Sequence, residues 1–177
     1  MRVLVAYASK MGSTKGIAEF IGEKLRARGA PTDVREVSSV ENVGDYDAFV
    51  IGSAVYNHHW PKEAKEFVSR NRSILAGRPV WVFSSGPTGR SETDKKGRYL
   101  RETNAPKERD EVREWINPRD HRIFFGAFFA DRLTGAMRLF AGAIPKDEQG
   151  DFRNWGEIEA WTNGIASALS TSVAGGP

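Results

Sequence analysis

Short apolar runs alternate along this chain with segments in which apolar residues recur every three to four positions. The first run, VLVAYA at Val3–Ala8, has the length and composition of a buried strand. The segment after it keeps helical spacing as far as Leu25, and Gly29 then ends the pattern. We expect Ser13 or Thr14 to cap this helix, because short hydroxyl side chains accept hydrogen bonds from free N–H groups at a helix start.

The alternation continues to the end of the sequence. Four further strands are predicted, at DVREV (33–37), AFVIGSAVY (48–56), RPVWVFSSGP (78–87) and HRIFFGAFF (121–129). Helical patterns occupy 62–75, the neighbourhood of 108–116, and 154–169, where Asn154 is the expected cap. Strands and helices in this order favour an α/β fold: a doubly wound, five-stranded parallel sheet with helices on both faces.

Length and composition limit what this fold can contain. At 177 residues and 40% hydrophobic content, the chain fits a single domain over 1–170, followed by a short Gly-rich segment, 171–177, that we expect to be a flexible tail. The sequence has no cysteine, which removes disulfides, thiolate metal sites and thiol catalysis together. Any redox chemistry must therefore come from a bound cofactor.

Charge and hydropathy indicate which partners to expect. The 26 Lys and Arg against 23 Asp and Glu give a net charge of +3, and no nucleic-acid-binding module is recognisable, so we expect no nucleic-acid partner. The N-terminus lacks a secretory signal pattern, which favours the cytoplasm. The apolar stretch Ile123–Ile144 contains Asp131, Arg132 and Arg138, too polar for a membrane span. It either packs in the core and a homodimer or touches the inner membrane face peripherally.

The loop SKMGST (9–14), between the first strand and its helix, has the properties of a phosphate cradle. Gly12 lets the backbone approach an anion, hydroxyl groups lie on either side of it, and Lys10 adds positive charge. The helix that follows offers free N–H groups and a dipole that favours negative charge. Taken alone, an ordinary strand-to-helix turn explains the loop equally well. The P-loop and dinucleotide fingerprints are both absent from it.

The loop SAVYNHHW (53–60) follows the third strand. Tyr56 is placed there to stack on a flat ligand ring, although plain packing is the commoner role for such an aromatic. The adjacent His58 and His59 lack a third ligand at metal-binding spacing, so we predict no metal site. His58 is instead the first candidate for a catalytic group that protonates or hydrogen-bonds a substrate.

The loop SSGPTG (84–89) follows the fourth strand, and its bent backbone leaves polar groups free to pair with the edge of a ring. Ligands of open α/β sheets bind at the carboxyl ends of the strands, where the strand order reverses. Three unusual loops at the ends of strands one, three and four therefore predict one shared binding site.

These loops and the strand order resemble those of the flavodoxin-like FMN-binding family, over nearly the whole chain and with the sheet order 2-1-3-4-5. The resemblance implies that FMN is the cofactor. Its phosphate would be bound by Ser9, Lys10, Met11, Gly12, Ser13 and Thr14. One face of its ring system would be flanked by Ala54, Val55, Tyr56 and Asn57. The pyrimidine edge would face Ser84, Ser85, Gly86, Pro87 and Thr88.

Within that family, GSAVYNHHWPKEAKEFV and GDFRNWGEIEAWTNGIASAL look most similar to the menaquinone-dependent protoporphyrinogen IX dehydrogenase branch. The resemblance implies an FMN-dependent oxidoreductase that passes electrons to a quinone-type acceptor. A non-enzymatic flavodoxin-type electron carrier is the alternative. Positive residues in or after the flavin loops predict a less negative potential than that of an acidic carrier. They are Lys10, Arg90, Lys95, Lys96, Arg98 and Arg101.

Overall fold

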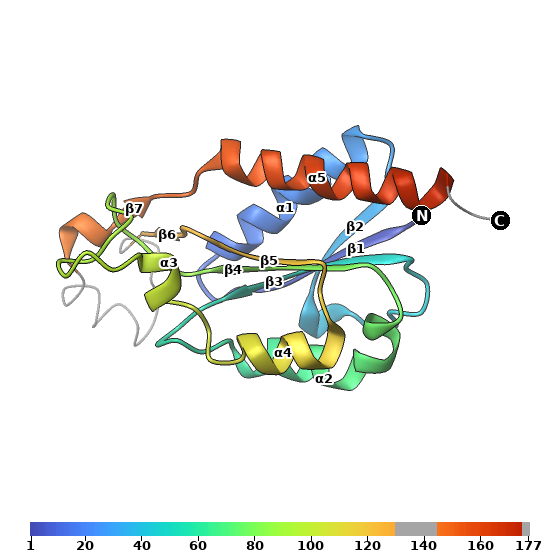
Figure 1. The fold of residues 1–177 in the computed structure, drawn as a ribbon, viewed down its shortest axis with the longest axis horizontal. Coiled ribbons are helices and arrows are strands. Elements are labelled where there is room, and N and C mark those ends of the chain that lie inside the picture. The colour runs from blue at the N-terminus through green and yellow to red at the C-terminus, as the bar shows by residue number, and fades with distance from the viewer. Residues whose placement is uncertain (130–144, 175–177) are drawn as a thin grey trace.

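Five parallel strands form the central sheet in the order β2-β1-β3-β4-β5, as predicted. The computed structural model describes residues 1–129 and 145–174 (Figure 1). The strands are β1 (Val3–Ala8), β2 (Thr32–Glu36), β3 (Ala48–Ala54), β4 (Val80–Ser85) and β5 (Asp120–Phe124). Because β3 lies on the other side of β1 from β2, the strand order reverses between β1 and β3. That reversal creates a crevice at their carboxyl ends.

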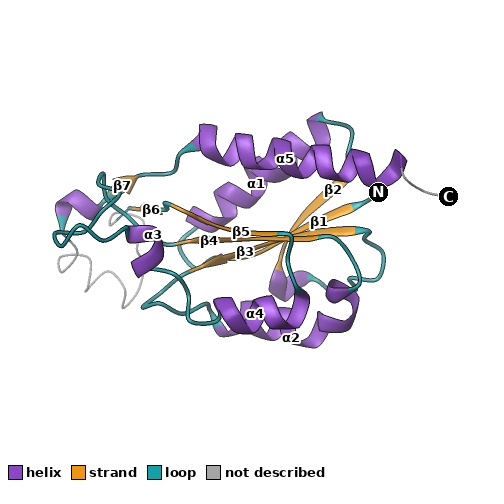
Figure 2. Cartoon of the chain, in the orientation of Figure 1, coloured by secondary structure: helices purple, strands orange, loops and turns teal. Residues whose placement is uncertain are grey.

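Helices cover both faces of the sheet. On one face lie α1 (Ser13–Ala27) and α5 (Trp155–Ala174), and on the other lie α2 (Lys62–Ala76) and α4 (Arg109–Ile116) (Figures 1 and 2). The layers bury two separate hydrophobic clusters, one on each face. This two-sided burial explains why the central strands are continuous apolar runs rather than alternating patterns.

The central strands are packed closely enough to require glycine at one position. Every residue of β3 is buried, and Gly52 pairs with Phe83 of β4. A Cβ atom on Gly52 would lie 2.1 Å from Cζ of the Phe83 ring. The ring therefore occupies the space that any other side chain at position 52 would need.

The predicted fifth strand, 121–129, is two strands. Residues 120–124 pair with β4, whereas β6 (Ala127–Phe128) leaves the sheet and pairs antiparallel with β7 (Gly150–Asp151). Gly126 separates the two, and its N–H donates to the carbonyl of Pro87 at 2.8 Å. Apolar composition continues through the break, because the end of β5 and both residues of β6 are buried, so periodicity alone could not locate it.

The helix ends differ from the predictions in two places. Gly12 with φ +82° occupies the N-cap of α1 and no side chain caps it, so the predicted Ser13 or Thr14 cap is wrong and both residues lie in the first helical turn. The Asn154 cap is confirmed, since its Oδ1 accepts the Glu157 N–H at 3.1 Å. Helix α5 continues to residue 174, into the segment predicted to be a flexible tail.

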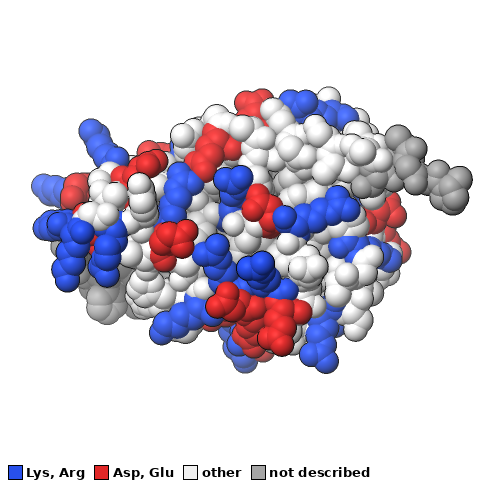
Figure 3. Space-filling model, in the orientation of Figure 1, with Lys and Arg blue, Asp and Glu red and all other residues white. Residues whose placement is uncertain are grey.

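The polar interval between β4 and β5 contains a short helix, α3 (Leu100–Thr103), before α4. Arg101 holds it in place: the guanidinium donates to both carboxylate oxygens of Glu157 and, at 3.0 Å, to the carbonyl of Ile123. Figure 3 shows Lys and Arg gathered at the end of the molecule where α3 and β7 lie, with both charge signs mixed elsewhere on this face.

None of the helices in the described ranges has the length and apolar character that a bilayer crossing needs. Most of the apolar stretch predicted to contact a membrane surface or a second copy, residues 130–144, lies outside the described residues.

Candidate functional site

A cavity of about 390 Å³ lies at the carboxyl ends of β1, β3 and β4, at the point where the strand order reverses. Its volume falls within the usual range for small-ligand and cofactor sites. Residues from all three predicted loops line it: Ser9, Met11, Ser13, Thr14, Ala54, Val55, Tyr56, Asn57, Ser85, Gly86 and Thr88. The topology thus brings together loops that are up to about seventy residues apart in the sequence.

The loop from Ser9 to Thr14 turns into α1 at Gly12. The Ser9 hydroxyl accepts the Gly12 N–H at 3.0 Å, and the carbonyl of Gly12 accepts the first helical hydrogen bond, from Gly16, at 3.0 Å. The first N–H groups of any helix have no intrahelical acceptor, and apart from the Ser9 hydroxyl on Gly12 no side chain of the described residues caps the start of α1. The beginning of α1 therefore has donors and a positive dipole end to offer an anion.

The side chain of Thr14 provides evidence that a ligand would bind at this position. It is 1% exposed, and its Oγ1 has no hydrogen-bond partner among the described residues. Leaving a buried hydroxyl without a partner costs free energy, so native proteins satisfy almost all such groups. A phosphate at the start of α1 would supply an acceptor for this hydroxyl and for the helix N–H groups together. The residues present thus fit the phosphate of the predicted FMN.

The chain after β3 forms a tight turn. Tyr56 and His59 exchange backbone hydrogen bonds at 2.8 and 2.9 Å, and the two residues between them have positive φ, 50° at Asn57 and 65° at His58. Such a two-residue turn is typical of a β-hairpin, in which positive φ matches the twist of the flanking chain. Tyr56 and Asn57 line the cavity, whereas His58 is exposed at the tip of the turn and lies outside the lining.

The hydroxyl of Tyr56 reaches across to the Ser9–Thr14 loop. It accepts the backbone N–H of Lys10 at 3.2 Å, and the ammonium of Lys10 lies 5.8 Å from the centroid of the Tyr56 ring. Burial raises the pKa of the Tyr56 hydroxyl, and the hydrogen bonds from Lys10 and Met11 only partly oppose this effect. The phenol is therefore neutral at physiological pH and joins the two loops on either side of the cavity.

The two serines that end β4 face opposite sides of the sheet, as neighbouring strand residues must. Ser85 lies at the cavity, with its Oγ 3.4 Å from Oγ of Ser13. Ser84 faces the other layer, where it accepts from the Trp60 indole at 3.0 Å and lies 2.9 Å from Nε2 of His121. Of the predicted set, Lys10, Gly12, Ser84 and Pro87 do not line the cavity.

The segment after β5 forms a wall of the cavity that the sequence patterns did not indicate. Gly126, Ala127, Phe128 and the distant Glu148 all line it. A Cβ atom on Gly126 would lie 3.1 Å from Oγ of Ser85 and 3.2 Å from Oγ of Ser13, so the close approach favours glycine. The isolated glycine within the predicted strand was the one available signal, since glycine in such a position often marks a break or a close backbone approach.

The second histidine of the turn, His59, faces the carboxylate of Glu108, the N-cap residue of α4, rather than the cavity. Its Nδ1 lies 2.8 Å from Oε1 of Glu108, whose Oε2 accepts the Trp60 N–H at 3.0 Å. Burial by itself raises the pKa of Glu108, but the bonds from His59 and Trp60 outweigh it and hold that pKa below its usual value. No cluster of three or more potential metal ligands occurs within residues 1–129 and 145–174.

Comparison with known proteins gives a consistent family. A family model described as a flavodoxin domain matches residues 4–154. Protoporphyrinogen IX dehydrogenase [quinone] of Escherichia coli (strain K12) is 28% identical over 86 residues, covering 48% of each chain, so this chain spans about half the length of the curated relatives it matches.

Solved structures show the same fold. A flavodoxin from the domain Archaea superposes with a TM-score of 0.63 at 17% identity, covering 96% of this chain and 99% of that one. Rubredoxin oxygen:oxidoreductase from Desulfovibrio gigas gives 0.63 at 14% identity, covering 98% and 37%.

Proposed function

Because the chain belongs to the flavodoxin domain family and its cofactor is FMN, we propose that it is an oxidoreductase that passes electrons from an organic substrate to a quinone-type acceptor. The proposed substrate resembles protoporphyrinogen IX, in line with the similarity to the Escherichia coli enzyme over 48% of its length. Bound FMN supplies the redox chemistry, accepting electrons from a donor and releasing them to an acceptor.

The observation that carries the FMN site is the unpartnered, buried hydroxyl of Thr14 at the uncapped start of α1. Around it, the phosphate loop would consist of Ser9, Lys10, Met11, Gly12 and Ser13. The N–H groups of Lys10 and Gly12 already bond Tyr56 and Ser9, so the start of α1 would supply the free donors. These groups are fixed before the cofactor arrives, because the Ser9 hydroxyl already bonds the Gly12 N–H and Ser13 already accepts from Ala127.

The two remaining loops would orient the ring system. Ala54, Val55, Tyr56 and Asn57 would flank one face, with the Tyr56 ring providing the stacking surface. Ser85, Gly86, Pro87 and Thr88 would offer polar backbone groups to the pyrimidine edge. In our proposal Ser84 does not touch the ring. Its hydrogen bond to Trp60, on the other face of the sheet, would hold the start of this loop in place.

His58 is the proposed proton-transfer group. It lies at the exposed tip of the turn whose neighbouring residue, Asn57, lines the cavity, so a substrate entering from solvent would meet it first. The matching experiment is a His58→Asn protein, in which asparagine tolerates the positive φ of 65°. It should keep full FMN content and lose turnover roughly tenfold or more. Full turnover in this variant would remove His58 from the mechanism.

A quinone acceptor dissolved in lipid would bring the protein to the inner face of the membrane as a peripheral partner. Co-sedimentation with liposomes at low and high salt tests this, because binding that disappears in salt is charge attraction alone. A homodimer remains part of the proposal, with size-exclusion chromatography coupled to light scattering as its test.

The cofactor is tested first. The purified protein, titrated with FMN, should quench the flavin fluorescence with one-to-one stoichiometry, and a Thr14→Val protein should bind more weakly. Under anaerobic conditions, protoporphyrinogen IX with menadione should then give protoporphyrin fluorescence only when the FMN-loaded protein is present. Quenching without turnover of any donor–quinone pair would identify the alternative, a flavodoxin-type electron carrier that has the same FMN site.

A further inference from the structure

The turn at residues 56–59 is held in a conformation that the sequence alone would not favour. Neither Asn57 nor His58 is a glycine, yet both have positive φ, and His58 has no special tolerance comparable to that of glycine. Backbone in such regions costs free energy and persists only where surrounding structure fixes it. Some contact outside the turn must therefore hold it in place.

Three hydrogen bonds from the start of α4 supply that contact. The Lys107 N–H donates to the carbonyl of His58 at 2.9 Å. The Glu108 carboxylate uses one oxygen on the His59 ring, at 2.8 Å, and the other on the Trp60 N–H, at 3.0 Å. Hydrogen bonds to a buried carboxylate are among the stronger ones in proteins, and Glu108 is only 9% exposed.

The far side of the turn is anchored in the core. Trp60 is 5% exposed, and its indole donates to the hydroxyl of Ser84, which points from β4 toward the layer of α2 and α4. The residues after the tip of the turn are thus fixed by Glu108 and Trp60. The residue before it, Tyr56, bonds Lys10 across the cavity and carries the ring that would stack on the flavin. Movement of residues 58–60 would consequently move Tyr56, because Tyr56 and His59 exchange two backbone bonds.

We propose that Glu108 is a positioning residue for the cofactor: by binding His59 and Trp60 it fixes the 56–59 turn, and through that turn it sets the place of Tyr56 against FMN. The inference rests on the proposed FMN site. It assigns a role in cofactor binding to the N-cap residue of α4, which does not line the cavity and lies 48 positions from Trp60 in the sequence.

The test compares two neighbouring glutamates, Glu108 at the N-cap of α4 and Glu111 within the helix. Glu108→Gln keeps the shape of the side chain but removes its charge, whereas Glu111→Gln removes the ion pair with Lys65, 2.7 Å away, and leaves the turn untouched. Fluorescence titration should show FMN binding weakened roughly tenfold in the first variant and by less than about twofold in the control. Visible circular dichroism of the bound flavin should change in Glu108→Gln alone, because the signal reports how the ring sits against its neighbours.

A double variant shows whether Glu108 acts through Tyr56. In a Tyr56→Ala background, Glu108→Gln should weaken FMN binding by less than about twofold further, since coupled residues give non-additive losses.

Should Glu108→Gln fail to fold, Glu108→Asp keeps the charge, shortens the reach and should show a smaller loss in the same direction. Wild-type affinity and an unchanged flavin spectrum in a folded Glu108 variant would overturn this inference but not the proposed function. Full additivity with Tyr56→Ala would have the same meaning. A wild-type protein that binds no FMN would overturn the proposed function as well.

Discussion

The hydroxyl of Ser13 accepts the backbone N–H of Ala127 at 2.8 Å, across 114 positions of sequence. The next residue, Thr14, also lines the cavity, and its hydroxyl has no partner among the described residues. The Ser13 hydroxyl thus ties α1 to the segment after β5, whereas the Thr14 hydroxyl would be free to bind the proposed phosphate.

Replacing Thr14 by valine should separate cofactor binding from stability. Valine keeps the shape and removes a buried hydroxyl that has no partner, so the cofactor-free protein should unfold at the same urea concentration or gain about 1 kcal/mol. FMN affinity should fall roughly tenfold. Ser13→Ala is the matched comparison, and it should destabilise the cofactor-free protein by about 1 kcal/mol because Ala127 loses its acceptor. A Thr14→Val protein that loses stability but not affinity would contradict this assignment.

The charge of Lys10 should raise the two-electron potential of bound FMN. Arg98 and Arg101 are paired with Asp94 and Glu157, whereas Lys10 lies in the Ser9–Thr14 loop that borders the cavity. A positive charge nearby stabilises the anionic reduced flavin, so Lys10→Gln should lower the midpoint by roughly 10–20 mV. Potentiometric titration with redox dyes measures this.

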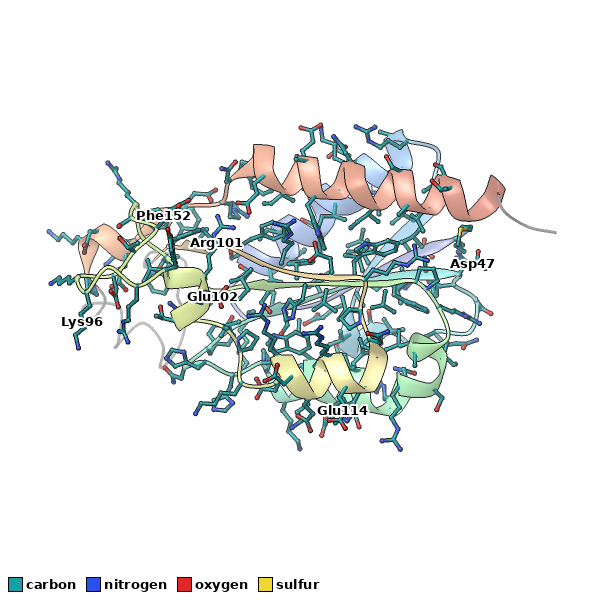
Figure 4. The ribbon with its side chains drawn as sticks, in the orientation of Figure 1. Asp47, Lys96, Arg101, Glu102, Glu114 and Phe152 are labelled. Atoms are coloured by element: carbon teal, nitrogen blue, oxygen red, sulfur yellow. The ribbon has the colours of Figure 1, made fainter. Side chains whose placement is uncertain are left out.

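A distal charge serves as the control for Lys10. Arg28→Gln changes an exposed charge at the opposite end of α1 from the cavity and should leave the midpoint unchanged. Lys96, which Figure 4 shows pointing into solvent at the end of the molecule, should have an effect intermediate between the two. Equal shifts from Lys10 and Arg28 would mean that only net charge matters.

Acid should destabilise the fold through His121. Burial, and after it the charge of Arg109, lowers the pKa of His121 from 6.5 to about 4. The unfolded chain then takes up a proton at a higher pH than the folded one, so the stability that His121 contributes is complete above about 6.5 and is lost as the pH falls toward 4. The loss should reach roughly 2–3 kcal/mol.

The measurement is urea unfolding at several pH values for wild type and His121→Gln. The glutamine can still bond Ser84 but does not titrate, so wild type should lose roughly 2–3 kcal/mol relative to the variant as the pH falls from 6.5 to 4.5. Carboxylates titrate mainly below about pH 4.5 and also change the stability there, so the two proteins are compared only between pH 6.5 and 4.5. Parallel curves would show that His121 has an ordinary pKa.

The close packing of β3 against β4 should make Gly52→Ala strongly destabilising. The added methyl would meet the Phe83 ring at 2.1 Å in a region where both residues are buried. Overpacking of this kind should cost about 3 kcal/mol, more than the entropy gained from replacing glycine. A folded Gly52→Ala protein within about 1 kcal/mol of wild type would show that the ring can move aside.

The sheet could be predicted because buried parallel strands have a strong local signature. Val3–Ala8 and 48–54 are continuous apolar runs followed by polar loops, and these two features locate the strand ends that form the cavity. Helix ends were less predictable. Ser13 has the right chemistry for a cap, yet Gly12 takes that position because its positive φ turns the chain into α1.

Side-chain direction and long-range partners could not be predicted. Ser84 and Ser85 look equivalent in the sequence, and only the pleat of β4 turns one toward Trp60 and the other toward the cavity. In the sequence, Glu108 looks like the first residue of an ordinary charged helix, because no neighbouring residue indicates that its carboxylate contacts His59. Contacts between distant segments depend on how the layers pack, which periodicity does not encode.

With FMN bound as proposed, the glycine cap at the start of α1 would link the lifetime of this protein to the supply of flavin. If the cofactor completes the first donors of α1 and the Thr14 hydroxyl as proposed, that end of the helix would be weakest when FMN is scarce, and proteases cut locally opened chain. Binding stabilises the folded state in proportion to the logarithm of free cofactor. Newly made chains would thus accumulate where FMN is plentiful and be degraded where it is not, so that abundance follows cofactor supply without a dedicated regulator.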